Sequence, residues 1–148
     1  MSTEHHALAG ATLHKFLTIN RFLRQYARQM DKSGIHPRAF SVLRYLTERE
    51  AATVGEVQEY LYCSASVASS VISKLEEGGY VTRTRSREDN RVVIVEPTDA
   101  GRTLATTTPI GGIGLLRRRL PTLDPERLAR MHDALDDIME LMEVPETE

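Results

Sequence analysis

The sequence has a single cysteine, Cys63, and no tryptophan, and aromatic residues make up only 5% of it. One cysteine cannot form an intrachain disulfide, which fits a reducing compartment. No apolar run approaches the roughly 18 residues that a membrane-spanning helix requires, and the first ten residues lack the basic and apolar regions of a signal peptide. We therefore expect a cytoplasmic protein without contact to a membrane.

Motifs that are typical of catalytic sites are also missing. The chain has no Gly-x-Ser-x-Gly, His-Glu-x-x-His, Cys-x-x-Cys or phosphate-loop pattern. Its five histidines are scattered, and no two of them lie four residues apart, the spacing that would place two metal ligands on one helix face. His132 and Asp136 have this spacing, but on a charged helix we interpret them as an ordinary surface pair. We expect no enzymatic activity, no metal site and no cofactor.

The net charge of −2 conceals an uneven distribution. Residues 120–148 hold two basic and nine acidic groups, a net of −7, which leaves +5 for the rest of the chain. A basic body with an acidic C-terminal helix is typical of a DNA-binding protein whose acidic part faces away from the phosphates.

The two ends of the chain predict helices with narrow apolar stripes, spaced alternately by three and four residues. The first helix covers about residues 7–30, and Asp124-Pro125 opens the last as cap and first-turn proline. Thr98 can cap another long helix, kinked or frayed near Pro109. Narrow stripes pack best against a partner helix, so we expect residues 7–32 and 98–143 to form a homodimer. The stripes consist of Phe16, Ile19, Leu23, Tyr26 and Met30, and of Leu128, Met131, Leu135, Ile138 and Met142.

Residues 36–97 predict three short helices and a β-hairpin. Pro37 suits the first turn of a helix, and Thr53 with Glu56 is a capping-box signature for the next. A third helix begins near Ser64 or Ser66 and ends at Gly78-Gly79, after a connection short enough to force a sharp corner. β-branched residues then flank a polar loop, which indicates a two-stranded hairpin. This order predicts a mainly α fold with a small β-hairpin wing, the winged helix-turn-helix.

The second helix of such a motif enters the major groove of DNA, and here it is rich in serine. Serine is poor in helix interiors, so a run of serines indicates a surface in use, although a solvated face remains the alternative for any one of them. Small hydroxyls allow close approach and can bind phosphates or base edges. The expected DNA-contacting residues of this helix are Ser64, Ser66, Ser69, Ser70 and Lys74.

The hairpin loop is rich in arginine, which suits a narrow and electronegative minor groove. We expect Arg85, Arg87 and Arg91 to contact DNA, with Asp89 orienting them through local salt bridges. Arg83 we assign to a strand rather than to DNA.

The segment LYCSASVASSVISKLEEGGYV, followed by RTRSREDNRVVIVEPTDAG, resembles the recognition helix and wing of the multiple-antibiotic-resistance regulator (MarR) family. The family has an aspartate, one or two basic residues, a β-strand and then Leu-Thr-x-x-Gly at its wing. This chain has Asp89-Asn90-Arg91, then Val92 to Val95, then Pro97-Thr98-Asp99-Ala100-Gly101. It departs from the pattern at Asn90, where a second basic residue is common, and at Ala65 and Ser70, where many members carry arginine.

The resemblance implies a dimer that regulates transcription by binding a pseudo-palindromic site in double-stranded DNA, and that responds as a repressor to a small-molecule effector. It places the effector between the dimer helices and the DNA-binding lobe. The residues that approach this cleft by their position are His14, Arg21, His36 and Tyr45.

Two alternatives remain at this point. The winged helix could bind a protein partner instead of DNA, although the basic wing argues against it. Cys63 could sense peroxides, but relatives that do so carry their cysteine near the start of the first helix. Cys63 aligns with a position that is usually small and apolar, so we expect a buried structural thiol.

Overall fold

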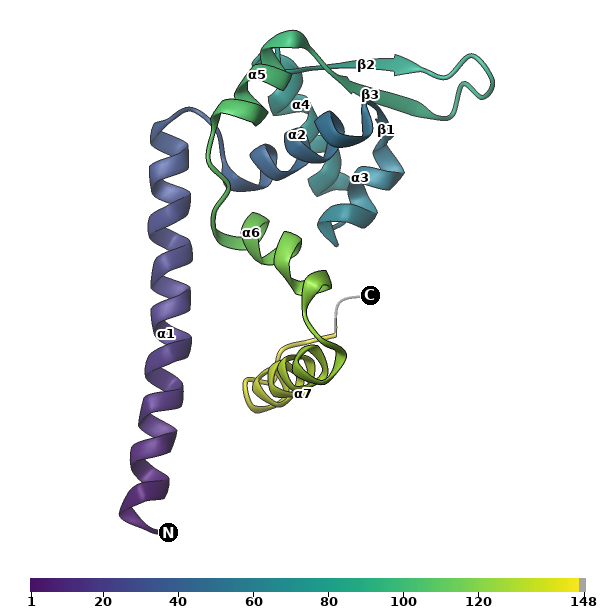
Figure 1. Ribbon diagram of the computed structural model, residues 1–148. Coiled ribbons are helices and arrows are strands. Elements are labelled where there is room, and N and C mark those ends of the chain that lie inside the picture. Colours follow the sequence, from purple (N-terminus) through teal and green to yellow (C-terminus); the bar gives the residue numbers. More distant parts are fainter. Residues whose placement is uncertain (147–148) are drawn as a thin grey trace. The chain divides into compact units, whose positions relative to one another are not determined.

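The computed structural model describes residues 1–146, and 69% of these residues are helical. Three strands form one antiparallel sheet. The predicted class, a mainly α winged helix-turn-helix fold, is confirmed. The elements, in order, are α1 (Thr3–Lys32), α2 (Pro37–Arg49), β1 (Ala52–Thr53), α3 (Val54–Leu61), α4 (Ala65–Glu77), β2 (Val81–Arg85), β3 (Val93–Pro97), α5 (Asp99–Thr107), α6 (Gly112–Arg119), the 3-10 helix η1 (Leu120–Thr122) and α7 (Pro125–Leu141) (Figure 1).

The chain divides into two compact units, the first of which is Met1–Gly112. The core of this unit lies between α2, α3, α4 and the sheet, and α2 packs against all of these elements and α5. α1 joins the core near its C-terminal end, where Met30 is buried and Tyr26 packs against the cluster. Ile35, in the turn after α1, is buried there as well. The largest fully buried side chains are Val42, Leu43, Leu46, Val57, Ile72, Leu75, Val81 and Val95.

Side-chain caps determine where the helices of this unit begin. The Thr53 hydroxyl accepts a hydrogen bond from the Glu56 backbone N–H, and the Glu56 carboxylate accepts one from the Thr53 N–H, as the capping box predicts. The Ser64 hydroxyl caps α4 by accepting a hydrogen bond from the Val67 N–H, and the Thr98 hydroxyl caps α5 by accepting one from the Gly101 N–H. α1 is longer than expected because Ser2 caps it, so that it begins at Thr3.

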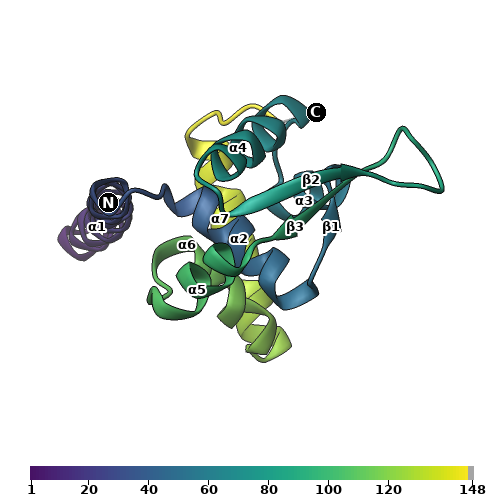
Figure 2. The same cartoon turned by 90° about the horizontal axis from the view of Figure 1, so that it is seen from above.

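The wing has a third strand that the sequence did not indicate. β1 pairs with β3, which lies between β1 and β2, through Ala52 opposite Val95 and Thr53 opposite Ile94. Two residues are too few to show the alternation that marks a strand. Since β1 runs directly into α3, it fastens the start of that helix to the sheet, while β2 and β3 extend further to the loop at the wing tip (Figures 1 and 2).

The helix after Thr98 is interrupted near Pro109, as expected, but the interruption is a complete break into two helices, α5 and α6, and not a kink in one long helix. Thr108 is extended at the end of α5, as a residue before a proline prefers. The Tyr26 ring lies against Gly111 and Gly112, where a side chain would overlap it, and Gly112 has a φ of +55°. These glycines therefore allow a turn and a close contact with α1 rather than a kinked helix.

The N-terminal apolar stripe is only partly available to a partner. Met30 is buried in the core of its own chain, and Tyr26 packs against Gly111 and Gly112. Phe16 and Leu23 are half-buried, and Ile19 is exposed. The C-terminal end of this stripe therefore packs within its own chain, and only the remaining part is open to a partner.

The second unit begins at Ile113 and contains the rest of α6, η1 and α7. Asp124 caps α7 by accepting a hydrogen bond from the Arg127 N–H, with Pro125 in the first turn, as predicted. Leu135 on α7 and Met142, which directly follows this helix, are each 56% exposed. Within residues 1–146, no helix is long and apolar enough to cross a membrane.

Candidate nucleic-acid interface

α4 presents two polar edges beside its buried side. Ala68, Ile72 and Leu75 are buried against the core. Ser66, Ser70 and Lys74 are exposed and follow each other at intervals of four residues, so they form one outer edge of the helix. This edge matches three of the residues that the sequence predicts to touch DNA.

The other two predicted residues of this helix have structural tasks as well. The Ser64 hydroxyl accepts a hydrogen bond from the Val67 N–H at 3.2 Å and so caps α4. Ser69 is half-buried, and its backbone carbonyl accepts a hydrogen bond from Arg83. A helix N-terminus carries unpaired N–H groups and a partial positive charge, so the Ser64 end is suited to face a phosphate.

The wing loop is held by hydrogen bonds within itself. Arg85 Nη1 donates to the Asn90 carbonyl at 2.8 Å, and the Ser86 N–H donates to the Val92 carbonyl at 2.8 Å. Arg85, Arg87 and Arg91 are all exposed. The loop therefore has a defined shape while its three predicted arginines remain in contact with solvent.

Asp89 orients the loop through the backbone and not through the expected salt bridges. Its carboxylate accepts a hydrogen bond from the Arg91 N–H at 3.0 Å. Among the ion pairs of residues 1–146, none joins Asp89 to an arginine of the wing. The expected salt bridges are thus wrong, because the carboxylate closes a turn instead.

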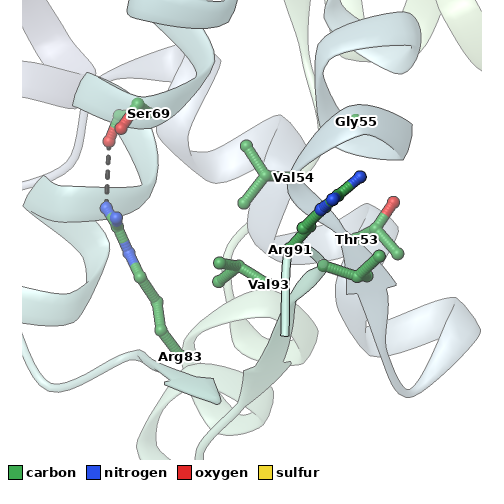
Figure 3. Close-up of a pocket in the computed structure, with 8 residues that line it drawn as sticks. Thr53, Val54, Gly55, Ser69, Arg83, Arg91 and Val93 are labelled. Atoms are coloured by element: carbon green, nitrogen blue, oxygen red, sulfur yellow. Dashed lines mark hydrogen bonds between the residues drawn. The ribbon is translucent and has the colours of Figure 1, made fainter. Parts of the chain in front are cut away.

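A cavity of about 470 Å³ opens between the start of α3, the middle of α4 and the wing. Figure 3 shows the Arg91 side chain lying beside Thr53 at the start of α3, while Arg83 points across to Ser69 on α4. The wing therefore directs one guanidinium toward each helix of the helix-turn-helix: Arg91, from the loop, toward the start of α3, and Arg83, from β2, toward α4. The lining residues are Thr53, Val54, Gly55, Ser69, Arg83, Arg91, Val92 and Val93.

The four residues predicted for an effector cleft have separate surroundings. His14 and Arg21 are exposed on α1. His36 caps α2, because its Nδ1 accepts a hydrogen bond from the Arg38 N–H. The Tyr45 ring stacks on Tyr60 with the centroids 4.2 Å apart.

Cys63 is a free thiol at the corner between α3 and α4. It is half-buried and packs against the hydrophobic core, so it is less enclosed than the buried structural thiol that we expected. Its neighbour Tyr62 has a φ of +52°, which turns the chain sharply into the cap of α4.

His132 lies within 3.3 Å of Asp133 and 3.5 Å of Asp136, and all three are exposed on α7. Exposed pairs of this kind contribute little to stability. The group is consistent with the ordinary surface pair that we expected.

A helix with a polar outer edge, entered by a sharp corner and flanked by a hairpin with exposed arginines, defines a winged helix-turn-helix DNA-binding protein. The sequence model of the MarR family matches residues 33–91, which run from the end of α1 to the wing. The Bacillus subtilis "Organic hydroperoxide resistance transcriptional regulator" is 30% identical over 122 residues, covering 80% of each chain. The chain therefore belongs to the MarR family of transcriptional regulators, and the prediction that it is not an enzyme is confirmed.

Two further relatives extend the comparison. "HTH-type transcriptional repressor MdtR" of Bacillus subtilis is 26% identical over 99 residues, which cover 67% of this chain and 64% of that protein. The fold is similar to that of the S. aureus MepR–DNA complex, with a TM-score of 0.63 and 17% identity, over 87% of this chain and 96% of MepR.

The contact that joins the recognition helix to the wing is not among the predicted features. Arg83, on β2, binds the edge of α4 that carries Ser69 and Ser73. Two sequence periodicities are consistent with this contact. Arg83 is two residues from the buried Val81, so it lies on the inner face of β2, and the two serines are four residues apart, so they lie on one edge of α4. Neither pattern shows by itself that the two edges meet.

Proposed function

We propose that this protein is a homodimeric, ligand-responsive repressor that binds a pseudo-palindromic site in double-stranded DNA. The observation that carries the proposal is the exposed edge of α4, formed by Ser66, Ser70 and Lys74, beside a wing with three exposed arginines. An edge of short side chains fits the major groove, and guanidinium groups fit the phosphates and minor groove next to it.

Within this interface the wing and the helix have different tasks. Arg87 and Arg91 neutralise phosphates, so their contribution is largely independent of base sequence. Ser66 and Ser70 are uncharged, so they contribute hydrogen bonds to the cognate site without releasing counterions. We assign Ser64 and Ser69 to the same interface, together with Arg85.

The test is a pair of salt titrations, one with cognate and one with random duplex, for single alanine variants. Arg87→Ala and Arg91→Ala should weaken binding to both duplexes and lower the salt slope by about one unit per lost phosphate contact. Ser66→Ala and Ser70→Ala should cost roughly 1–3 kcal/mol on the cognate duplex where the residue reads a base, with an unchanged slope. Wing variants that lose only cognate affinity at an unchanged slope would contradict this division.

Exposed apolar residues at both ends of the chain support the dimer. More than half of the residue surface is exposed in the single chain for Leu13, Leu17 and Ile19 on α1, for Leu135 on α7 and for Met142 directly after it. It is costly to leave these two groups of apolar side chains in water, and a second copy of the chain would cover both groups.

The repressor role is supported by the name of one relative, the repressor MdtR. The effector cleft remains a proposal based on position, with His14, Arg21, His36 and Tyr45 as the residues that would line it. His14 and Arg21 are exposed on α1, and α1 would lie at the dimer interface. The proposed cleft would therefore be completed by the second subunit.

The basic wing favours DNA over a protein as the partner. The two are separated by retention of the protein on random duplex DNA. A DNA-binding protein should elute as salt is added, whereas a protein-binding winged helix should not be retained at low salt.

A further inference from the structure

Arg83 differs from the other arginines of the wing because it faces the protein. It lies on β2 two residues after the buried Val81, so both side chains are on the inner face of the hairpin. Its partner across the sheet is the fully buried Val95. The Arg83 side chain is 27% exposed, whereas Arg85 and Arg87 lie on the exposed surface.

The guanidinium of Arg83 reaches three residues on one edge of α4. Nη2 donates to the Ser69 carbonyl at 3.1 Å and to the Ser73 hydroxyl at 2.5 Å. Nε lies 3.9 Å from a carboxylate oxygen of Glu76 and is buried, with no hydrogen-bond partner among the described residues. Ser69, Ser73 and Glu76 are spaced by four and three, so one side chain contacts two successive turns of the helix.

This edge is not the outer edge formed by Ser66, Ser70 and Lys74. Ser69 is the one residue proposed for both, and Arg83 binds its backbone carbonyl rather than its hydroxyl. Ser66, Ser70 and Lys74 are exposed, while Ser69 and Ser73 are half-buried beneath Arg83. Because the guanidinium of Arg83 is bound to α4, this side chain does not extend toward a phosphate of the DNA. A flat guanidinium with several fixed N–H groups can hold a carbonyl and a hydroxyl together, which a lysine ammonium cannot do in the same geometry.

We propose that Arg83 is a positioning residue that fixes the recognition helix α4 to strand β2, so that helix and wing bind DNA as one rigid body. The hairpin extends beyond the helices (Figure 1), and small changes of its angle at β2 would move the wing tip relative to α4. This inference rests on the proposed function, since it assigns the residue a part in DNA binding.

The first experiment compares Arg83→Lys and Arg83→Gln with Arg87→Gln, a matched exposed arginine of the same hairpin. Affinity for cognate duplex should fall by roughly 10- to 100-fold in both Arg83 variants, because charge-assisted hydrogen bonds are lost, and the salt slope should not change. Arg87→Gln should lower the slope by about one unit. If Arg83→Lys binds as the wild type does and Arg83→Gln lowers the slope, Arg83 contacts a phosphate and the proposal is overturned.

The second experiment needs no DNA. Amide hydrogen exchange of the free protein should be faster in Arg83→Lys across β2, β3 and the Ser69–Glu76 part of α4, and unchanged in the core of α2. Arg87→Gln should leave all of these segments as in the wild type. Uniform faster exchange would indicate a merely structural role, and unchanged exchange at the wing would show that Arg83 does not hold it; either outcome overturns the proposal.

Ser73→Ala tests the same link with a smaller perturbation that removes one acceptor. It should lose cognate affinity in the same direction as Arg83→Lys, and the double variant should be no weaker than Arg83→Lys alone, because both changes break one contact. Additive losses would contradict the link. A wild-type protein that binds no duplex would contradict the proposed function instead, while the exchange experiment would still decide whether Arg83 fixes the wing to α4.

Discussion

Gly101 shows how a single residue determines the junction between the wing and α5. Its N–H donates to the Thr98 hydroxyl that caps the helix, and the Thr98 N–H donates to the Tyr80 carbonyl at 2.9 Å. A Cβ at Gly101 would overlap that carbonyl oxygen and come within 3.0 Å of Leu43 Cδ1. Thr98 and Gly101, which belong to the family pattern, therefore have distinct structural roles. Thr98 caps α5, and Gly101 allows the backbone of α5 to approach that of Tyr80.

Gly101→Ala should consequently destabilise the protein by about 1–3 kcal/mol or more, because neither the backbone of Tyr80 nor the buried Leu43 can move freely. Gly10→Ala is a matched control, since a Cβ at Gly10 on α1 would meet nothing within 4 Å. That control should be neutral or stabilising by up to about 1 kcal/mol. Urea unfolding followed by circular dichroism measures both, and equal midpoints for the two variants would contradict the assignment.

Cys63 separates two proposals for regulation, a response to a small-molecule ligand and a response to peroxide through this thiol. It packs against the core at the corner of the helix-turn-helix, so Cys63→Ala should be tolerated and Cys63→Ser should be less stable, because the hydroxyl would enter an apolar contact. DNA binding by Cys63→Ala should match the wild type with and without peroxide, as a band-shift titration can measure. If peroxide releases the wild type from DNA and leaves Cys63→Ala bound, the protein is a redox sensor through this thiol.

At the scale of elements, the sequence predicted best where local chemistry decides the structure. The caps Thr53, Ser64, Thr98 and Asp124 mark the first residues of four helices because each supplies a hydroxyl or carboxylate to its own first turn. The sequence failed where distant segments meet. β1 exists only because β3 offers a pairing edge, and α5 and α6 separate at glycines that lie against Tyr26, more than 80 residues earlier in the chain.

The same limit applies to the candidate interface. Exposure of Ser66, Ser70 and Lys74 follows from helical periodicity, which the sequence displays. The link from Arg83 to Ser73 does not, because it depends on how β2 crosses α4. The charges of the loop predict that Asp89 orients the arginines, yet its short side chain binds the nearby backbone N–H of Arg91 instead.

The capping box of α3 gives a test at this scale. Thr53→Ala removes the acceptor for the Glu56 N–H, and should cost about 1 kcal/mol of unfolding free energy. Thr12→Ala on α1 is the control, because the Thr12 hydroxyl only binds the Leu8 carbonyl within the helix, and alanine is the better helix former. Denaturant midpoints should fall for Thr53→Ala alone; a fall in both would indicate that the cap is not the cause.

At the scale of the whole molecule, the dimer can be tested at α7. Leu135 is 56% exposed in the single chain, so Leu135→Glu should leave the monomer folded and weaken only an interface that buries this side chain. Arg130→Glu is the control, since it places the same side chain on the polar side of the helix. Light scattering at micromolar concentration should give a dimer for the wild type and Arg130→Glu, and a monomer for Leu135→Glu. A monomeric wild type would reject the dimer itself.

The arrangement of two such subunits on DNA gives the last prediction. A two-fold dimer presents two α4 helices to the same face of the duplex, so half-site centres should lie about one turn, roughly 10 base pairs, apart. Inserting five base pairs between the half-sites rotates one of them by about half a turn and leaves only one subunit able to bind its half-site. Affinity for the cognate duplex should then fall toward that for random DNA, about 10³-fold or more weaker. Replacing the spacer with another sequence of equal length is the control and should have a much smaller effect, through duplex deformability alone. Competition titrations with the three duplexes measure this, and unchanged affinity after the insertion would show that the subunits do not bind DNA as a rigid pair.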